Sequence, residues 1–173
     1  MQVTFDQNLT FRSHIESKIK VASRSLAFIR NSFKYLDKKT FILLYKPLVR
    51  PHLEYCSPIW NPTLQYMATS IEKVQRRATK LVYRFDEIPY EERLRELDLP
   101  SLLFRRHRED IITAFKICKF YQDLKYIFSF QPREGLRGHD FCFQKERGRS
   151  RLFKNSLPNR LFATWNGLRR LPL

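Results

Sequence analysis

Apolar residues recur at helical spacing through the first part of the chain. Between residues 11 and 33 they follow one another alternately four and three positions apart, which places them along one side of a helix. Charged residues such as Lys20 and Arg24 lie off this line. The pattern predicts one long amphipathic helix that packs its apolar side against other helices. That side consists of Ile15, Ile19, Ala22, Leu26, Ile29 and Phe33.

A second helix is predicted to begin near Lys38, with Asp37 as its N-cap. Pro47 and Pro51 fall late in this segment, where each removes a backbone donor and crowds the preceding turn. We therefore expect a kink or a break rather than a smooth helix. The apolar positions of this helix are Phe41, Leu44, Tyr45 and Leu48.

A third helix, over residues 63–85, is predicted to have two opposed faces. It follows a proline-containing turn at 55–62, in which Trp60 is expected to plug the junction between helices. One face of the helix is apolar and carries Ile71, Val74, Ala78, Leu81, Val82 and Phe85. The other face is cationic and carries Lys73, Arg77, Lys80 and Arg84, spaced i, i+4, i+7 and i+11.

The rest of the chain predicts shorter helices and little sheet. Pro89 begins a short helix that ends near Leu97, and Pro100 begins a longer one that reaches about Tyr121. Residues 3–5 resemble a strand followed by a polar turn at 6–8. Two segments, 141–145 and 151–154, are predicted to pair as a hairpin, and Leu157 to begin a last amphipathic helix.

The predicted fold class is mainly α: a helical bundle with a short N-terminal strand and a small C-terminal β-hairpin plus helix. Four regions are expected. Residues 1–10 form the strand remnant, 11–85 the bundle, 86–130 a further helical segment packed on it, and 131–173 a basic hairpin and helix. With only 4 glycines, the chain has few positions for the tight turns of a many-stranded sandwich.

The high positive charge of the chain predicts a negatively charged binding partner. The 173 residues include 33 Lys and Arg against 17 Asp and Glu, a formal charge of +16. A charge so far from zero repels itself unless a polyanion neutralises it, and nucleic acid is the usual one. A membrane surface is the weaker alternative, and no segment approaches the ~20 apolar residues of a membrane span. Three widely spaced cysteines do not suggest a disulfide framework.

A search for catalytic chemistry finds little. Metal-dependent phosphoryl transfer needs carboxylates that share divalent ions, and the sequence has no Asp-Asp or Asp-x-Asp pair. Glu91 and Glu92 diverge on a helix and are expected to be solvated. A thiol nucleophile would need a histidine close to it, and Cys56 lies four residues after His52 on one possible helix face. The paired close spacing of zinc ligands is absent. We expect no catalytic residue, no metal site and no cofactor, and we expect Cys118 to be core packing.

The expected site is therefore electrostatic. Lysines and arginines that contact phosphates release counterions, which gives binding without sequence preference. The alternative, that these side chains are simply solvated, stays open. The partner that this charge predicts is a nucleic-acid backbone. The candidate nucleic-acid-binding residues are Lys20, Arg24, Lys73, Arg76, Arg77, Lys80, Arg84, Arg105, Arg106, Arg108, Arg149 and Arg151.

Ordered strings over the whole chain carry a family resemblance. The first half contains Tyr35–Thr40, Leu43–Lys46, Leu48–Tyr55, Trp60 with Pro62, and Ile71–Lys80. The second half contains Tyr90–Leu94, Leu97 with Leu99–Leu102, Arg105 and Arg106 with Asp110, Arg137–His139, and Asn159 and Arg160 with Trp165 and Asn166. Together they closely resemble the region after the palm in non-LTR retrotransposon reverse transcriptases of the LINE type, jockey-like members included.

The resemblance implies a thumb and post-thumb module, in which residues 11–85 are a thumb-like helical bundle and residues 1–10 are the remnant of the last palm strand. In that family the catalytic aspartates lie in a palm that precedes this region, and the paired-aspartate motif has no counterpart here. Gln2, at a position where relatives usually have glycine, suggests a truncated or domesticated reading frame. The chain alone is thus expected not to be an enzyme but to bind template-primer or RNA backbone, with the missing palm as a further partner. A protein-interaction module or a decayed fragment without a nucleic-acid role remains the alternative.

Overall fold

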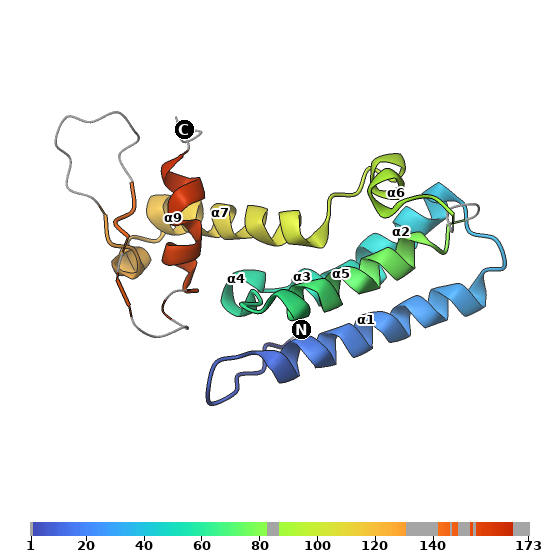
Figure 1. The fold of residues 1–173 in the computed structure, drawn as a ribbon, viewed down its shortest axis with the longest axis horizontal. Helices are drawn as coiled ribbons and strands as arrows, with labels where there is room; N and C mark the ends of the chain where they lie inside the picture. The colour runs from blue at the N-terminus through green and yellow to red at the C-terminus, as the bar shows by residue number, and fades with distance from the viewer. Residues whose placement is uncertain are drawn as a thin grey trace. The chain divides into compact units, whose positions relative to one another are not determined.

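The computed structural model describes residues 2–82, 87–130, 142–145, 147–148, 153 and 155–167. In this part the chain is mainly helical, as predicted (Figure 1). It divides into two compact units, Met1–Arg106 and His107–Leu173, and α7 carries residues of both. The elements are α1 (Arg12–Ser32), α2 (Lys38–Leu48), α3 (Arg50–Glu54), α4 (Ser57–Trp60), α5 (Gln65–Thr79), α6 (Tyr90–Glu96), α7 (Leu102–Phe120), the 3-10 helix η1 (Gln122–Ile127) and α9 (Leu157–Asn166).

The first unit is built on α1, which lies alongside α5 and α3 (Figure 1). The apolar side of α1 packs into the core, as the spacing predicted: Ile15, Ala22, Leu26 and Ile29 are all buried. Phe33, the last predicted position, follows the helix and is 40% exposed. Helices α2 to α5 supply further core residues, and so do the segment after α6 and the first residue of α7. These residues are Phe41, Tyr45, Leu53, Trp60, Met67, Ile71, Val74, Ala78, Leu97, Leu99 and Leu102.

The predicted cap and break of the second helix are both confirmed. The Asp37 carboxylate accepts a hydrogen bond from the backbone N–H of Lys39 at 3.2 Å, which satisfies one of the free donors at the start of α2. α2 ends at Leu48, directly after Pro47, and α3 begins at Arg50 with Pro51 in its first turn. Two short helices thus replace one long helix at this point.

The turn at 55–62 contains the short helix α4, and Trp60 closes the junction as expected. The Trp60 side chain is 2% exposed, and its indole N–H donates to the backbone oxygen of Tyr55 at 2.7 Å. Its ring lies 5.6 Å from the imidazole of His14 on α1. The tryptophan therefore joins the end of this turn to the first helix.

The predicted N-terminal strand is not formed. Residues 2–5 carry no ladder hydrogen bonds; the backbone N–H of Thr4 donates instead to Nδ1 of His14 at 3.1 Å. The predicted polar turn is present, because the Asp6 carboxylate accepts from the backbone N–H groups of Asn8 and Thr10. A strand needs a neighbouring strand for its backbone bonds, and the described residues of this chain offer none.

The second unit has its own small aromatic core. The rings of Phe128 and Phe143 stack at 4.5 Å, and Phe143 stacks in turn on Trp165 at 4.9 Å. Ala114, Ile117, Cys118 and Leu161 complete this core. The Asp110 carboxylate, which is fully buried, receives two hydrogen bonds of 2.7 Å from the Arg160 guanidinium. Asp110 and Arg160 thus join α7 to α9.

The predicted C-terminal hairpin is not seen in the described residues. Phe143, on its first arm, forms one isolated antiparallel bridge with Phe130. The backbone N–H and C=O of Phe143 also pair with the side-chain amide of Asn166, at 2.8 Å each. This side-chain pairing, together with the stacking on both faces of its ring, holds Phe143 without a second arm. Most of that second arm, residues 151, 152 and 154, lies outside the described residues.

The boundary between the units falls inside the segment 86–130, which was expected to form one region. Leu97, Leu99 and Leu102 pack into the first core, whereas Ala114, Ile117 and Cys118 pack into the second. The apolar pattern of α7 does not reveal this change of partner, because both halves of the helix have the same period.

Candidate nucleic-acid interface

α5 separates charge from apolar surface in the way its periodicity predicts. Its buried side includes Met67, Ile71, Val74 and Ala78, which recur at intervals of three or four residues. The packing of this side against the core orients the opposite side toward solvent. The cationic residues on that exposed side are Lys73, Arg76, Arg77 and, at the C-cap, Lys80.

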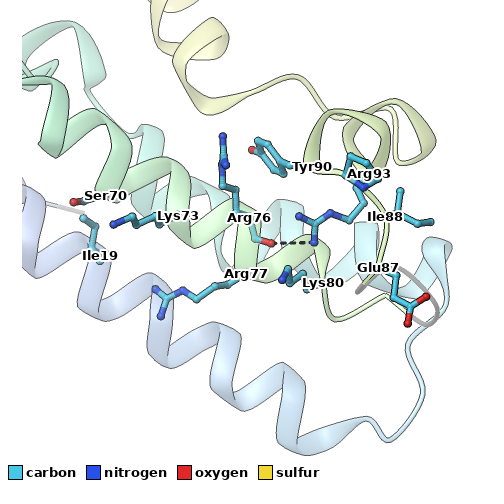
Figure 2. A pocket seen from close by; sticks show the side chains of 11 residues that line it. Ile19, Ser70, Lys73, Arg76, Arg77, Lys80, Glu87, Ile88, Tyr90 and Arg93 are labelled. Carbon is cyan, nitrogen blue, oxygen red and sulfur yellow. Dashed lines mark hydrogen bonds between the residues drawn. The ribbon is translucent and has the colours of Figure 1, made fainter.

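These four side chains line an open pocket of about 840 Å³ within the first unit (Figure 2). α1 contributes Ile19 to the pocket wall. The facing wall is formed by the start of α6 and the residues just before it, including Ile88 and Pro89. From α6 itself come Tyr90 and Arg93, which lie three residues apart and so on the same side of the helix.

The pocket is strongly cationic. Five Lys and Arg side chains line it, and Glu87 is the single acidic residue among the lining residues that the structure describes. In that part of the chain, none of Lys73, Arg76, Arg77 and Lys80 forms an ion pair. Arg77 donates one hydrogen bond, from Nη2 to the Ser23 hydroxyl on α1 at 3.2 Å. The positive charge therefore remains available to an anion.

The Tyr90 ring contacts the guanidinium groups of two arginines in the pocket, Arg76 and Arg93. The Arg76 guanidinium lies 4.6 Å from the centre of the Tyr90 ring, and the Arg93 guanidinium lies 5.6 Å from it. The Tyr90 hydroxyl donates to the carboxylate of Glu72 on α5. Burial raises the pKa of Tyr90 well above its ordinary value, and the hydrogen bond to Glu72 raises it further. The ring is therefore a neutral, fixed support for both guanidinium groups.

Arg93 is buried at the edge of this pocket, with an exposed fraction of 3%. Its Nη1 donates to the backbone oxygen of Arg76 at 3.4 Å (Figure 2). Its Nε finds no hydrogen-bond partner in the described residues. Burial lowers the pKa of Arg93, and the positive charge of Arg76 contributes to that shift. Sequence reasoning missed Arg93; its spacing of three from Tyr90 was the available signal.

The predicted cluster in the first turns of α7 is not a common cationic surface. The Arg105 guanidinium forms two hydrogen bonds with the carboxylate of Glu54 on α3, one of them 2.9 Å long, and Arg50 approaches the same carboxylate at 3.7 Å. Arg106 is 1% exposed. Arg108 is exposed, but it belongs to the second unit. Neither Arg105 nor Arg106 lines the cationic pocket.

Two other predicted residues lie on α1. Lys20 and Arg24 are both exposed, although neither lines the pocket. α1 and α5 pack against each other, and the bond from Arg77 to Ser23 joins the two helices next to these positions. The remaining predicted residues, Arg84, Arg149 and Arg151, lie outside the described residues.

Cys118, Glu91 and Glu92 were weighed in the sequence as possible catalytic residues. Cys118 is buried in the second core, as predicted, and burial raises the pKa of its thiol to about 11. Glu91 and Glu92 are exposed. Among the described residues, no group of three His, Cys, Asp or Glu side chains is arranged to hold a metal ion. No helix in that part of the chain has the length and apolar character to cross a membrane.

Comparison with protein-family models, with curated proteins and with solved structures found no match to this chain.

Proposed function

We propose that this chain is a non-catalytic nucleic-acid-binding module that holds RNA or RNA–DNA hybrid by its backbone, as the thumb and post-thumb region of a non-LTR retrotransposon reverse transcriptase would. The observation that carries the proposal is the pocket between α5 and α6. Five cationic side chains line it, and none of the five forms an ion pair within the described residues.

The geometry suits contacts to phosphates rather than to base edges. Four of the five cations lie on or directly after α5, whose other side packs into the core, so their backbones are held in place before a ligand arrives. Contacts to phosphates position a protein on nucleic acid but carry no sequence information. With about five such contacts, the logarithm of affinity falls with the logarithm of salt concentration with a slope of roughly −4.

A titration of the full chain with labelled RNA and RNA–DNA hybrid tests this function. We expect binding at ~50 mM salt that is independent of sequence and falls steeply as salt rises. The double variant Arg76→Ala, Arg77→Ala should reduce the magnitude of the salt slope by about 1.5 to 2. Because both side chains are exposed, its thermal midpoint should stay close to that of the unmodified chain.

A matched double variant controls for the loss of charge alone. Lys39 and Lys46 are exposed on α2 and do not line the pocket, so Lys39→Ala, Lys46→Ala removes the same charge from the same unit. This variant should weaken binding less than the pocket variant. Equal weakening by both variants would mean that net charge, not the pocket, holds the nucleic acid, and an absence of binding at ~50 mM salt would reject the function itself.

The resemblance also implies that polymerisation belongs to a lobe with its own aspartates. The chain alone is therefore proposed to be inactive as a polymerase. A primer-extension assay with divalent metal and nucleotides should give no product, and extension by the purified chain would overturn this part of the proposal.

Exposed apolar side chains favour a second candidate, a protein-interaction module. Phe28 on α1 and Leu43 on α2 are 68% and 73% exposed. A surface of this kind would drive self-association that strengthens with salt, whereas association through nucleic acid weakens with salt. Light scattering of the nucleic-acid-free protein over a range of salt concentrations distinguishes the two.

A further inference from the structure

Arg93 is the feature of the pocket that a simple backbone grip does not explain. Contacts to the outside of a duplex need long, exposed side chains, and Lys73, Arg76, Arg77 and Lys80 meet this requirement. Arg93 is 3% exposed and has an Nε donor without a partner in the described residues. Buried charged donors are normally satisfied, because leaving one unpaired costs free energy. Because Arg93 also lines the pocket, an anion that enters the pocket would meet its positive charge.

The walls of the pocket hold the guanidinium groups of Arg76 and Arg93 beside one tyrosine ring. Tyr90 supports both Arg76 and Arg93, and its hydroxyl is held by the Glu72 carboxylate. The same carboxylate accepts from the backbone N–H groups of Leu102 and Leu103, at 3.3 and 3.2 Å, at the start of α7. Three helices thus fix the support, and an entering anion would meet donors that are already ordered.

The charge and shape of the pocket select among phosphate ligands. Five cations and one carboxylate give the described lining a net charge of +4 (5 − 1). An internal phosphodiester carries one negative charge and enters a pocket only if the sugars on both sides follow. A terminal phosphate monoester carries about −1.5 to −2 charges at pH 7 and is tethered on one side only. Ile19, Ile88 and Pro89 offer apolar contacts to the attached nucleoside.

We infer that the pocket between α5 and α6 holds the terminal phosphate of a nucleic-acid strand, with the Arg93 and Arg76 guanidinium groups beside Tyr90 as its donors. This inference rests on the proposed function and adds a preference for phosphorylated strand ends to backbone binding. Lys73, Arg77 and Lys80 hold the following phosphates of the same strand.

The test compares the affinity of the full chain for single-stranded RNA with a 5′-phosphate, with a 3′-phosphate, and with hydroxyl groups at both ends. An unmodified strand that is one nucleotide longer controls for the added charge. At ~100 mM salt we expect one phosphorylated end to bind about tenfold more tightly than the unmodified strands, the effect of one or two charge-assisted hydrogen bonds. Comparison of the 5′ and 3′ arms identifies which end is held.

Two variants on the same helix make the test specific. Arg93→Gln removes the buried charge and should bring the ratio between phosphorylated and unmodified strands close to one. Arg95→Gln removes an equal charge from an exposed position that does not line the pocket, and should keep the ratio at about ten. If Arg93→Gln does not fold, as judged by circular dichroism, the comparison of strands on the unmodified chain still decides the inference.

The possible outcomes distinguish a terminal-phosphate site from backbone binding. Equal, salt-dependent binding of all strands overturns the terminal-phosphate site and leaves backbone binding in place. A preference that both variants retain likewise overturns it. Failure of every strand to bind rejects the proposed function, and the inference with it.

Discussion

Single side chains in the first unit have roles that depend on partners distant in the sequence. His14 is 2% exposed, and its Nδ1 accepts a hydrogen bond from the backbone N–H of Thr4. Only the neutral imidazole with an unprotonated Nδ1 can accept this bond. Burial lowers the pKa of His14 below its usual 6.5, and the positive charge of Lys18 lowers it further.

This arrangement predicts that the first unit loses stability in mild acid. The unfolded chain binds a proton at His14 more readily than the folded chain, so the contribution of His14 is complete above about pH 7 and is lost as pH falls below 6.5. His52 acts in the same direction, since its pKa is also lowered by burial and by Lys18. Thermal midpoints measured from pH 7.5 to 5.0 should fall.

The variant His14→Asn keeps an acceptor near the Thr4 N–H but has no group that titrates in this range. Its midpoint should depend less on pH than that of the unmodified chain. The same steep dependence in His14→Asn would assign the acid sensitivity to other groups.

The exposure of the basic residues was predictable on α5 but not on α7. Lys73, Arg77 and Lys80 are exposed, as their spacing along one helix face predicted, and the further candidate Arg76 is exposed as well. Arg106 is next to Arg105 in the sequence and equally basic, yet one is buried and the other is paired with Glu54. Neither outcome is visible in the sequence, because the partner of Arg105 lies 51 residues away and the burial of Arg106 depends on how the helices pack.

Buried polar bonds join the helices of the first unit. The Tyr45 hydroxyl on α2 donates to Oε1 of Gln75 on α5 at 2.6 Å. Nε2 of Gln75 donates in turn to the backbone oxygen of Pro100, just before α7, at 3.0 Å. Tyr45 and Gln75 are both almost fully buried. Water therefore cannot take the place of a hydrogen bond that either side chain loses.

Removal of the hydroxyl from this chain of bonds should therefore be costly. Tyr45→Phe leaves the Gln75 oxygen buried without its donor, and we expect a loss of about 1–3 kcal/mol in the free energy of unfolding. Urea denaturation measures the change. Tyr66, which is 52% exposed on α5, provides the matched control, and Tyr66→Phe should change stability by less than about 0.5 kcal/mol. Equal effects would mean that the buried bond contributes little.

Helices followed from local patterns, whereas strands did not. α1, α2 and α9 have their apolar spacing, caps or prolines within their own residues, so the signals that predict them are local. The predicted strand at 3–5 and the hairpin at 141–154 needed partners elsewhere. Thr4 bonds to His14 instead, and Phe143 bonds to Asn166.

The charge of the entire molecule opposes its folding. With a formal charge of +16, the compact chain repels itself at low ionic strength. Added salt screens exposed charges within a Debye length of about 10 Å at 0.1 M. The same screening weakens contacts to phosphates.

Salt should consequently have opposite effects on stability and on binding. Between 20 and 200 mM salt we expect the thermal midpoint of the free protein to rise while its affinity for RNA falls. Differential scanning fluorimetry and a binding titration in the same buffers check both directions. A midpoint that falls with salt would show that ion pairs such as Arg105 with Glu54 outweigh the net repulsion.

The sequence by itself determined the helical class, the position of most helices and the cationic face of α5, because three- and four-residue spacing, caps and prolines act within a few turns. Only the tertiary structure decided which cations share a pocket. Arg76 and Arg93 come from different helices, and both meet Tyr90 only after α6 packs beside α5. The physical reason is that charge pairing and burial depend on distances in space, which the order of residues along one helix does not contain.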